Sequence, residues 1–237
     1  MTHRAGLLPR VGVILLDTAF VRPPGDIGNA ETFGGRALFE RVPTATVGRV
    51  LAGAAEDDDL LAGFRVARNR LVARGAGMVT TSCGLLVFHQ RPLQQDCPVP
   101  FTASALMQIE LRRRQHGPVG VIALAQGSIT PSHLVAAGAD PATPIGALAE
   151  EGHLISVLRA NRPDLPIDAA RATADLVEAG RDLLARYPGL RALVLECTNL
   201  PPYQDGLKVA SGLPVYGFLD WLTAIHAGLA ETDGTLT

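Results

Sequence analysis

Val11-Gly12-Val13-Ile14-Leu15-Leu16 recurs in the second half of the chain as Val119-Gly120-Val121-Ile122-Ala123-Leu124, with five of six positions identical. Both segments are short, apolar and rich in β-branched residues, which is typical of a strand buried on both faces of a parallel sheet. A polar loop follows each of them. The repeat therefore indicates two related halves, each beginning with a buried strand.

Two further pairs of segments repeat in the same order and at similar spacing. The run Met78-Val79-Thr80-Thr81-Ser82 leads into Cys83, and Ala192-Leu193-Val194-Leu195-Glu196 leads into Cys197. A strand containing proline follows each cysteine, Pro98-Val99-Pro100-Phe101 in the first half and Leu213-Pro214-Val215-Tyr216 in the second. Three pairs in one order predict an internal duplication.

Helical patterns fill the gaps between these strands. Apolar residues recur at helical spacing from Leu60 to Val72, the acidic run Asp57-Asp58-Asp59 favours a helix start, and Gly75 favours its end. A second such segment runs from Leu176 to Leu184. Alternating strands and helices predict an α/β fold with two pseudo-symmetric half-domains. Each would be a short parallel sheet flanked by helices, with the active site in the cleft between them.

The two halves are expected to meet near Gly117-Pro118. The chain after Leu213 is too short to form a unit of its own, so we expect it to cross back and complete the first half. The predicted half-domains are therefore residues 1–117 plus 214–237, and residues 118–213.

Composition and charge exclude several classes of protein. The 237 residues are 47% hydrophobic and carry a net charge of -2, which gives no basic footprint for nucleic acid and no cationic face for a membrane. No apolar run approaches the roughly 20 residues of a spanning helix, and the N-terminus lacks the apolar core of a secretion signal. Three cysteines far apart in the sequence indicate a reducing compartment. We therefore expect a cytoplasmic protein that binds neither nucleic acid nor membranes.

Cys83 and Cys197 end equivalent predicted strands, which is where open α/β sheets bind ligands. Gly84 and Asn199 lie just after them, where a tight turn can open a helix whose amides favour thiolate. Taken alone, each cysteine would be interpreted as a small core residue, as we interpret Cys97, which has no partner in the repeat. Equivalence in the duplication instead predicts two catalytic thiols that face one site from opposite sides.

Thr80-Thr81-Ser82-Cys83-Gly84 and Leu195-Glu196-Cys197-Thr198-Asn199 resemble the two cysteine motifs of the aspartate/glutamate racemase superfamily. The resemblance extends from Val11 to about Leu222. It implies two α/β halves with a cleft between them, no cofactor, and a small-molecule carboxylate or hydantoin substrate. A homodimer is compatible with the scaffold. The superfamily includes amino-acid racemases, hydantoin racemases, arylmalonate decarboxylases and maleate isomerases, and its decarboxylases keep only the cysteine that matches Cys197.

The mechanism implied by this resemblance is that of a cofactor-independent isomerase of the amino-acid racemase type. One thiolate removes a proton next to a carboxylate or carbonyl, and the thiol opposite returns a proton to the other face. The expected substrate-binding residues, which contribute side chains or the backbone amides after each cysteine, are Asp17, Thr18, Ser82, Gly84, Thr198 and Asn199. No metal site is expected, because the histidines show no metal-ligand spacing.

The chain departs from glutamate racemases beside both cysteines. Gly84-Leu85 replaces their Asn-Thr, and Asn199 replaces their second-motif histidine. Asp17-Thr18 resembles their Asp-Ser, but the loop continues differently from Val21 to Asn29. These differences leave the substrate open.

Other functions and roles also stay open at this point. A decarboxylase-like lyase or a maleate-type isomerase would use Cys197, and a non-catalytic binding protein on the same scaffold would need neither thiol. Asp17 either holds a ligand or caps a turn. Arg22 is interpreted as a solvated loop residue rather than a partner of a substrate carboxylate, and the loop that it begins, to Asn29, is a candidate mobile lid.

Overall fold

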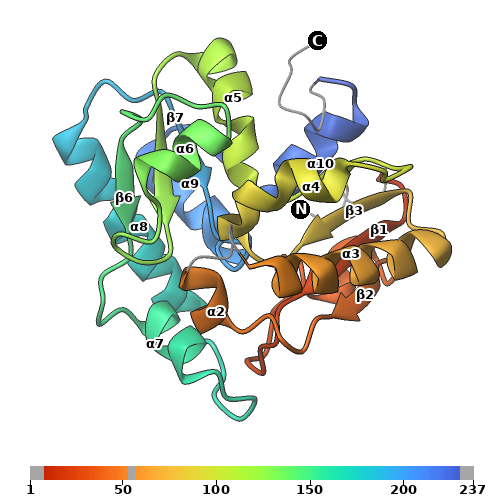
Figure 1. Cartoon of the computed structure of the whole chain (residues 1–237). Coiled ribbons are helices and arrows are strands. Elements are labelled where there is room, and N and C mark those ends of the chain that lie inside the picture. The colour runs from red at the N-terminus through yellow and green to blue at the C-terminus, as the bar shows by residue number, and fades with distance from the viewer. Residues whose placement is uncertain (1–7, 53–56, 230–237) are drawn as a thin grey trace.

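The computed structural model describes residues 8–52 and 57–229 (Figure 1). The strands within these ranges are β1 (Val11–Leu15), β2 (Leu38–Arg41), β3 (Met78–Thr81), β4 (Phe101–Thr102), β5 (Val119–Ala123), β6 (Ile145–Ala147), β7 (Ala192–Leu195) and β8 (Val215–Tyr216). The α-helices are α2 (Val47–Leu51), α3 (Asp58–Ala73), α4 (Gln90–Gln94), α5 (Ile109–His116), α6 (Pro131–Ala136), α7 (His153–Ala160), α8 (Ala169–Arg186), α9 (Gln204–Ser211) and α10 (Phe218–His226). Short 3₁₀ helices are η1 (Ala30–Phe33), η3 (Gly84–His89), η4 (Ala105–Gln108) and η5 (Pro201–Tyr203).

The strands form two four-stranded parallel sheets with equivalent topology. Their orders are β2-β1-β3-β4 and β6-β5-β7-β8. The pairing register is also equivalent, since Val11 lies opposite Met78 in the first sheet and Val119 lies opposite Ala192 in the second. The duplication seen in the sequence is therefore a duplication of the sheet, and the predicted α/β fold with two pseudo-symmetric parallel sheets is confirmed.

The predicted helices cover the outer faces of these sheets. In α3, the Asp57 carboxylate caps the first turn by accepting from the Leu60 amide at 2.9 Å, and Gly75 follows the helix with φ +87°. Figure 1 shows α3 alongside β1, β2 and β3, and α8 on the other half beside β6. Leu60, Phe64 and Leu71 of α3 are fully buried, each contributing roughly 1.5–3 kcal/mol relative to exposure.

The glycine shared by the two repeated strands has the same packing role in each half. A Cβ at Gly12 would lie 3.0 Å from Cβ of Leu71 in α3, and a Cβ at Gly120 would lie 2.9 Å from Leu183 in α8. Glycine at these positions lets the covering helix approach the strand closely. Packing of a helix against each sheet therefore explains why both copies of the repeat have glycine at this position.

Alternate residues of each first strand enter different apolar clusters. Val11 and Val13 face an inner cluster that also contains Val119 and Val121 from the other half. Ile14 enters the cluster under α3, while side chains of β5 and β7 that point outward enter the cluster under α8. The inner cluster therefore joins the two sheets, and a further cluster lies between each sheet and its covering helix.

The helices that follow the last strand of each sheet cross to the opposite half. Helix α5 packs on β5 and β7, and in α10 the Trp221 indole donates to the Thr102 hydroxyl of β4 at 2.7 Å. The expected return of the chain to the first half at residue 214 is wrong for β8, because Val215 pairs with Leu193 of β7 in the second sheet.

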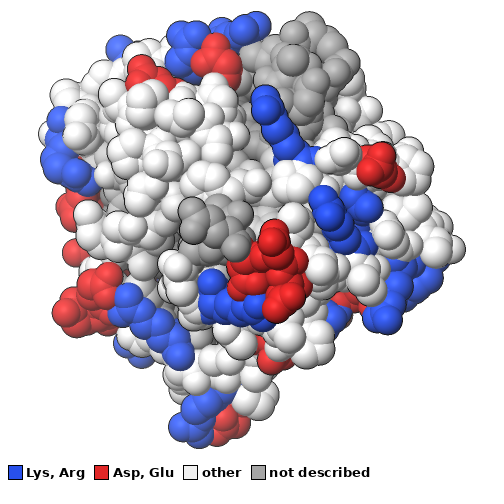
Figure 2. Space-filling model, in the orientation of Figure 1, with Lys and Arg blue, Asp and Glu red and all other residues white. Residues whose placement is uncertain are grey.

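The surface in Figure 2 carries interspersed acidic and basic side chains rather than a broad patch of one sign. No helix within residues 8–52 and 57–229 combines the length and apolar character that crossing a bilayer requires.

Candidate active site

The two cysteine motifs meet where β3 and β7 end. Cys83 is the N-cap residue of η3, directly after β3 and Ser82, and Cys197 lies two residues beyond β7. The Thr198 hydroxyl donates to the Ser82 carbonyl at 2.8 Å, so the motifs touch across the boundary between the halves. Cys83 is partly buried and Cys197 is buried. The two predicted catalytic thiols therefore lie in one region of the fold.

Two of the predicted substrate-binding hydroxyls take part in internal contacts. The Ser82 hydroxyl accepts from the Leu16 amide at 3.0 Å, which ties β3 to the end of β1. Thr198 is fully buried, and its hydroxyl uses its one hydrogen to donate to the backbone carbonyl of Ser82. Thr198 therefore joins the halves in this conformation rather than donating to a ligand.

Gly84 of the first motif packs closely against the second motif. A Cβ at this position would lie 2.5 Å from Oε1 of Glu196 and even closer to the Glu196 carbonyl. The carboxyl of Glu196, which precedes Cys197 in the chain, is therefore packed against the residue that follows Cys83. Only glycine fits here, because any Cβ would collide with Glu196.

Substitution Gly84→Ala is expected to destabilise the protein by about 1–3 kcal/mol, because the added methyl meets a backbone carbonyl that cannot rotate away. Gly189→Ala is the matched control, since a Cβ there has no neighbour within 4 Å. Chemical denaturation of both variants measures the difference. Equal stability of the two variants would contradict the packing described.

The loop between β1 and η1 reaches the second cysteine motif through a buried network of charged and polar groups. The side-chain amide Nδ2 of Asn199 donates to Asp26 at 2.6 Å, and Sγ of Cys197 donates to the side-chain oxygen Oδ1 of Asn199 at 3.4 Å. Arg22 pairs with Asp26 at 2.9 Å, and the side chains are 10% and 1% exposed. The expectation of a solvated Arg22 is wrong, because its side chain is largely buried and its guanidinium forms an ion pair with the Asp26 carboxylate.

The other two predicted loop residues have different environments. Thr18 is buried and accepts from Arg22 at 3.1 Å, so it belongs to the same network. Asp17 is 45% exposed and faces Arg41 at 3.4 Å, a surface ion pair without contact to either cysteine motif. The structure thus brings Thr18 and Asn199 to the site and leaves Asp17 outside it.

Both thiols have raised pKa values, in contrast to the expected stabilisation of thiolate. Burial and then the charge of Glu196 raise the pKa of Cys83 to about 12, offset in part by the Leu85 amide and Arg22. Burial and Glu196 also hold the pKa of Cys197 well above its usual value. Amide donors follow both cysteines as predicted, but burial outweighs them. The resting site therefore contains two protonated thiols.

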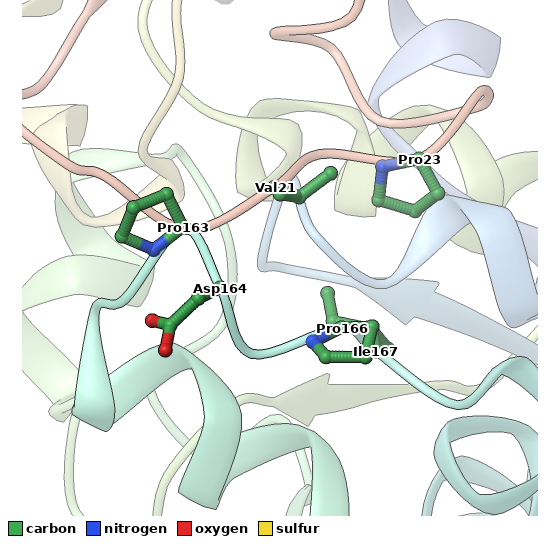
Figure 3. Close-up of a pocket in the computed structure, with 6 residues that line it drawn as sticks. All are labelled: Val21, Pro23, Pro163, Asp164, Pro166 and Ile167. Atoms are coloured by element: carbon green, nitrogen blue, oxygen red, sulfur yellow. The ribbon is translucent and has the colours of Figure 1, made fainter.

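Two cavities flank the loop from Ala19 to Asn29. One of about 360 Å³ lies at the end of β1, and Thr18, Arg22 and Arg41 are among its lining residues. The other, of about 380 Å³, is a groove in which Val21 and Pro23 lie opposite Pro166 and Ile167 (Figure 3). Among residues 8–52 and 57–229, no three His, Cys, Asp or Glu side chains are grouped to hold a metal ion.

Curated proteins with similar sequences are named as lyases. The chain is 27% identical over 217 residues to a dimethylsulfoniopropionate lyase of Durusdinium sp. clade D, an alignment that covers 87% of this chain and 70% of the relative. It is 25% identical over 252 residues to dimethylsulfoniopropionate lyase 5 of Emiliania huxleyi (strain CCMP1516), covering 95% of this chain but only 46% of that relative. No protein-family model matches the sequence.

Solved structures with the same fold are decarboxylases and racemases. A glycine-to-cysteine mutant of arylmalonate decarboxylase, in a sulfate-associated form, superimposes with a TM-score of 0.63 at 17% identity, covering 93% of this chain and 94% of that one. Glutamate racemase from Thermus thermophilus, in complex with β-chloro-D-alanine, gives 0.51 at 20% identity, covering 92% and 79%. The chain therefore has the fold of the aspartate/glutamate racemase superfamily, as the resemblance predicted.

Proposed function

We propose that this protein is a cofactor-independent lyase that removes a proton next to a carboxylate with a cysteine, and that its substrate is dimethylsulfoniopropionate. The observation that carries the proposal is the meeting of the two cysteine motifs across the halves, joined by Thr198 and Ser82. The similarity to named dimethylsulfoniopropionate lyases over most of the chain supports this choice of substrate.

The proposed reaction needs one base at the carbon next to the carboxylate. The Cys197 thiolate takes a proton from that carbon, and the C–H electron pair forms a double bond to the neighbouring carbon. The bond from that carbon to sulfur breaks, and its electron pair leaves with sulfur. The products are acrylate, neutral dimethyl sulfide and one proton. The leaving group requires no acid, because the sulfonium cation becomes neutral as it departs.

The charges of the site are compatible with such a substrate. Both thiols are protonated at rest, and a substrate that brings a positive sulfonium group favours thiolate beside it. Arg22 lines the cavity at the end of β1 and its charge lowers the pKa of Cys83, so it places positive charge beside that thiol while Asp26 remains its ion-pair partner. The sulfonium group of a bound substrate would therefore favour ionisation of the thiol that acts as the base.

Racemisation or isomerisation with two thiols is the second candidate. It is favoured by the presence of Cys83 as well as Cys197, because one base suffices for elimination whereas inversion of a carbon uses a group on each face. In this reading Cys83 and Cys197 exchange the roles of acid and base, on an amino acid or hydantoin.

One experiment in D2O distinguishes the proposed elimination from racemisation. The purified chain is incubated with dimethylsulfoniopropionate. In parallel it is incubated with single enantiomers of amino acids and of 5-substituted hydantoins. Gas chromatography measures dimethyl sulfide, and proton NMR measures acrylate and deuterium at the stereocentre. We expect dimethyl sulfide and acrylate in equal amounts, and no inversion of the other compounds. Deuterium incorporation with inversion would favour the racemase, and no change in any compound would contradict both.

A further inference from the structure

The loop that follows β1 in the first half is held against the second half, which carries Cys197. At its start, the backbone amide of Ala19 donates to Oδ1 of Asn161 at 2.7 Å. Further along, Gly25 packs against Pro202, since a Cβ at Gly25 would lie 3.2 Å from the Pro202 Cα. A segment of one half therefore forms part of the surroundings of the cysteine of the other half.

Asp26 is the charged residue by which this loop reaches the second cysteine motif. Its side chain is 1% exposed, and its two oxygens accept three hydrogen bonds. Oδ1 accepts from the Arg22 guanidinium at 2.9 Å and from the Gly28 amide at 2.7 Å. Oδ2 accepts from Nδ2 of Asn199 at 2.6 Å. Donors from both halves of the molecule thus fix the position of this buried carboxylate.

These contacts determine which way the Asn199 side chain faces. A carboxylate can only accept hydrogen bonds, so the NH2 group of Asn199 must face Asp26 and its oxygen must face the opposite way. On that side, Oδ1 of Asn199 accepts from Sγ of Cys197 at 3.4 Å. Both Asn199 and Cys197 are buried. A continuous series of hydrogen bonds therefore runs from the loop to the thiol.

We propose that Asp26 is a positioning residue that acts on Cys197 through Asn199, by holding the Asn199 amide with its oxygen toward the thiol. A base must approach the C–H bond of its substrate along one line, so the direction of its sulfur affects the rate. The assignment of Cys197 as the base rests on the proposed function, whereas the hydrogen bonds themselves do not depend on it. A residue of the first half thus aligns the base of the second.

The variant Asp26→Asn breaks this series at its origin. The oxygen of the new amide stays with its two donors, Arg22 and Gly28, so its NH2 group faces the NH2 group of Asn199. Two donors cannot pair, so the Asn199 amide turns over and its oxygen leaves the thiol. Asn199→Ala removes the same oxygen directly, and it tests the link from the other side if Asp26→Asn does not fold.

Infrared spectroscopy of the S–H stretch is the first measurement, and it requires no substrate. Subtraction of the spectrum of the matching Cys197→Ser protein isolates the band of this thiol. Donation to an oxygen weakens the S–H bond, so the band should shift to higher frequency in Asp26→Asn and in Asn199→Ala. The double variant should show no further shift. A general loss of stability would leave the band in place.

The variant Asp17→Asn is the matched control for the infrared measurement. It removes the same charge from a pair with Arg41 that is nearly half exposed, so the band of Cys197 should not move.

Enzyme kinetics provide the second measurement. We expect Asn199→Ala to lower kcat for dimethyl sulfide release about tenfold and to change KM less than about twofold, because the amide contacts the sulfur. Asp26→Asn should lower kcat about fivefold alone, but less than about twofold in the Asn199→Ala background. Effects that multiply would show that Asp26 acts independently of Asn199, and a rise in KM alone would assign Asn199 to substrate binding. Either result would overturn the proposal.

The inference and the lyase function can fail separately. An unshifted band in Asp26→Asn would overturn the role of Asp26 while dimethyl sulfide release stayed intact. The expected shifts in a protein that releases no dimethyl sulfide would support the role of Asp26 and contradict the lyase.

Discussion

The variant Cys197→Ser is expected to lose at least a thousandfold in kcat/KM for dimethyl sulfide release. Serine is close to cysteine in size and can keep the contact to the side-chain oxygen Oδ1 of Asn199, but an alcohol is a far weaker acid than a thiol. The loss should therefore appear in the rate while the Tm changes little. Initial rates of dimethyl sulfide release and a thermal melt measure the two quantities. Retention of more than about a tenth of the activity would contradict Cys197 as the base.

Two further cysteine variants complete this experiment. Cys97→Ser is the matched control, because Cys97 precedes β4 and packs against the apolar cluster under α3, whereas the two cysteine motifs follow the carboxyl ends of β3 and β7, so full activity is expected. Cys83→Ser separates the two mechanisms. Elimination needs one base and should survive with a loss of about tenfold or less, whereas racemisation should disappear with either thiol.

The second large effect is expected from Asp26→Ala. The substitution removes the partner of a buried Arg22 and leaves the Gly28 amide and the Asn199 side chain without their acceptor. A buried ion pair broken on one side costs about 3–5 kcal/mol, since the remaining charge stays out of water. We expect that loss in the free energy of unfolding measured with urea, together with a lower kcat because Asn199 no longer orients Cys197.

The surface pair of Asp17 and Arg41 provides the comparison. Both side chains are nearly half exposed, so Asp17→Ala should cost about 0–1 kcal/mol. Unchanged activity of this variant is also expected, since Asp17 lies outside the site. If Asp17→Ala proved as damaging as Asp26→Ala, the assignment of the loop network would be wrong.

Much of the fold could be predicted because the sequence contains an internal duplication, and each copy forms one of the two sheets. The repeated strands β1 and β5, β3 and β7, and β4 and β8 are apolar and distinct, so their equivalence was visible in the sequence. The edge strands β2 and β6 were missed, because they are only partly buried and their residues show neither a long apolar run nor clear alternation.

The site was predicted less completely than the fold. The direction of the Glu196 side chain could not be derived from strand alternation, because β7 ends at Leu195 and the alternation ends with it. Arg22 and Asp26 pair within a loop, where the four-residue spacing that pairs opposite charges on a helix gives no signal. The raised thiol pKa values depend on burial, which local sequence does not reveal.

The exchange of helices α5 and α10 between the halves bears on how such a chain could arise. Helix α5 stacks Arg112 over Tyr216 of the second sheet, at 3.9 Å from the ring centre, and α10 contacts β4 of the first. If each half were once a separate chain, two identical copies would have exchanged their C-terminal helices, which correspond to α5 and α10. Such an exchange is found in domain-swapped dimers with a two-fold axis. Fusion of those copies at the turn around Gly117 would give one polypeptide free to diverge on either side of the axis. The position before each cysteine illustrates such divergence, since Ser82 in the first half corresponds to Glu196 in the second.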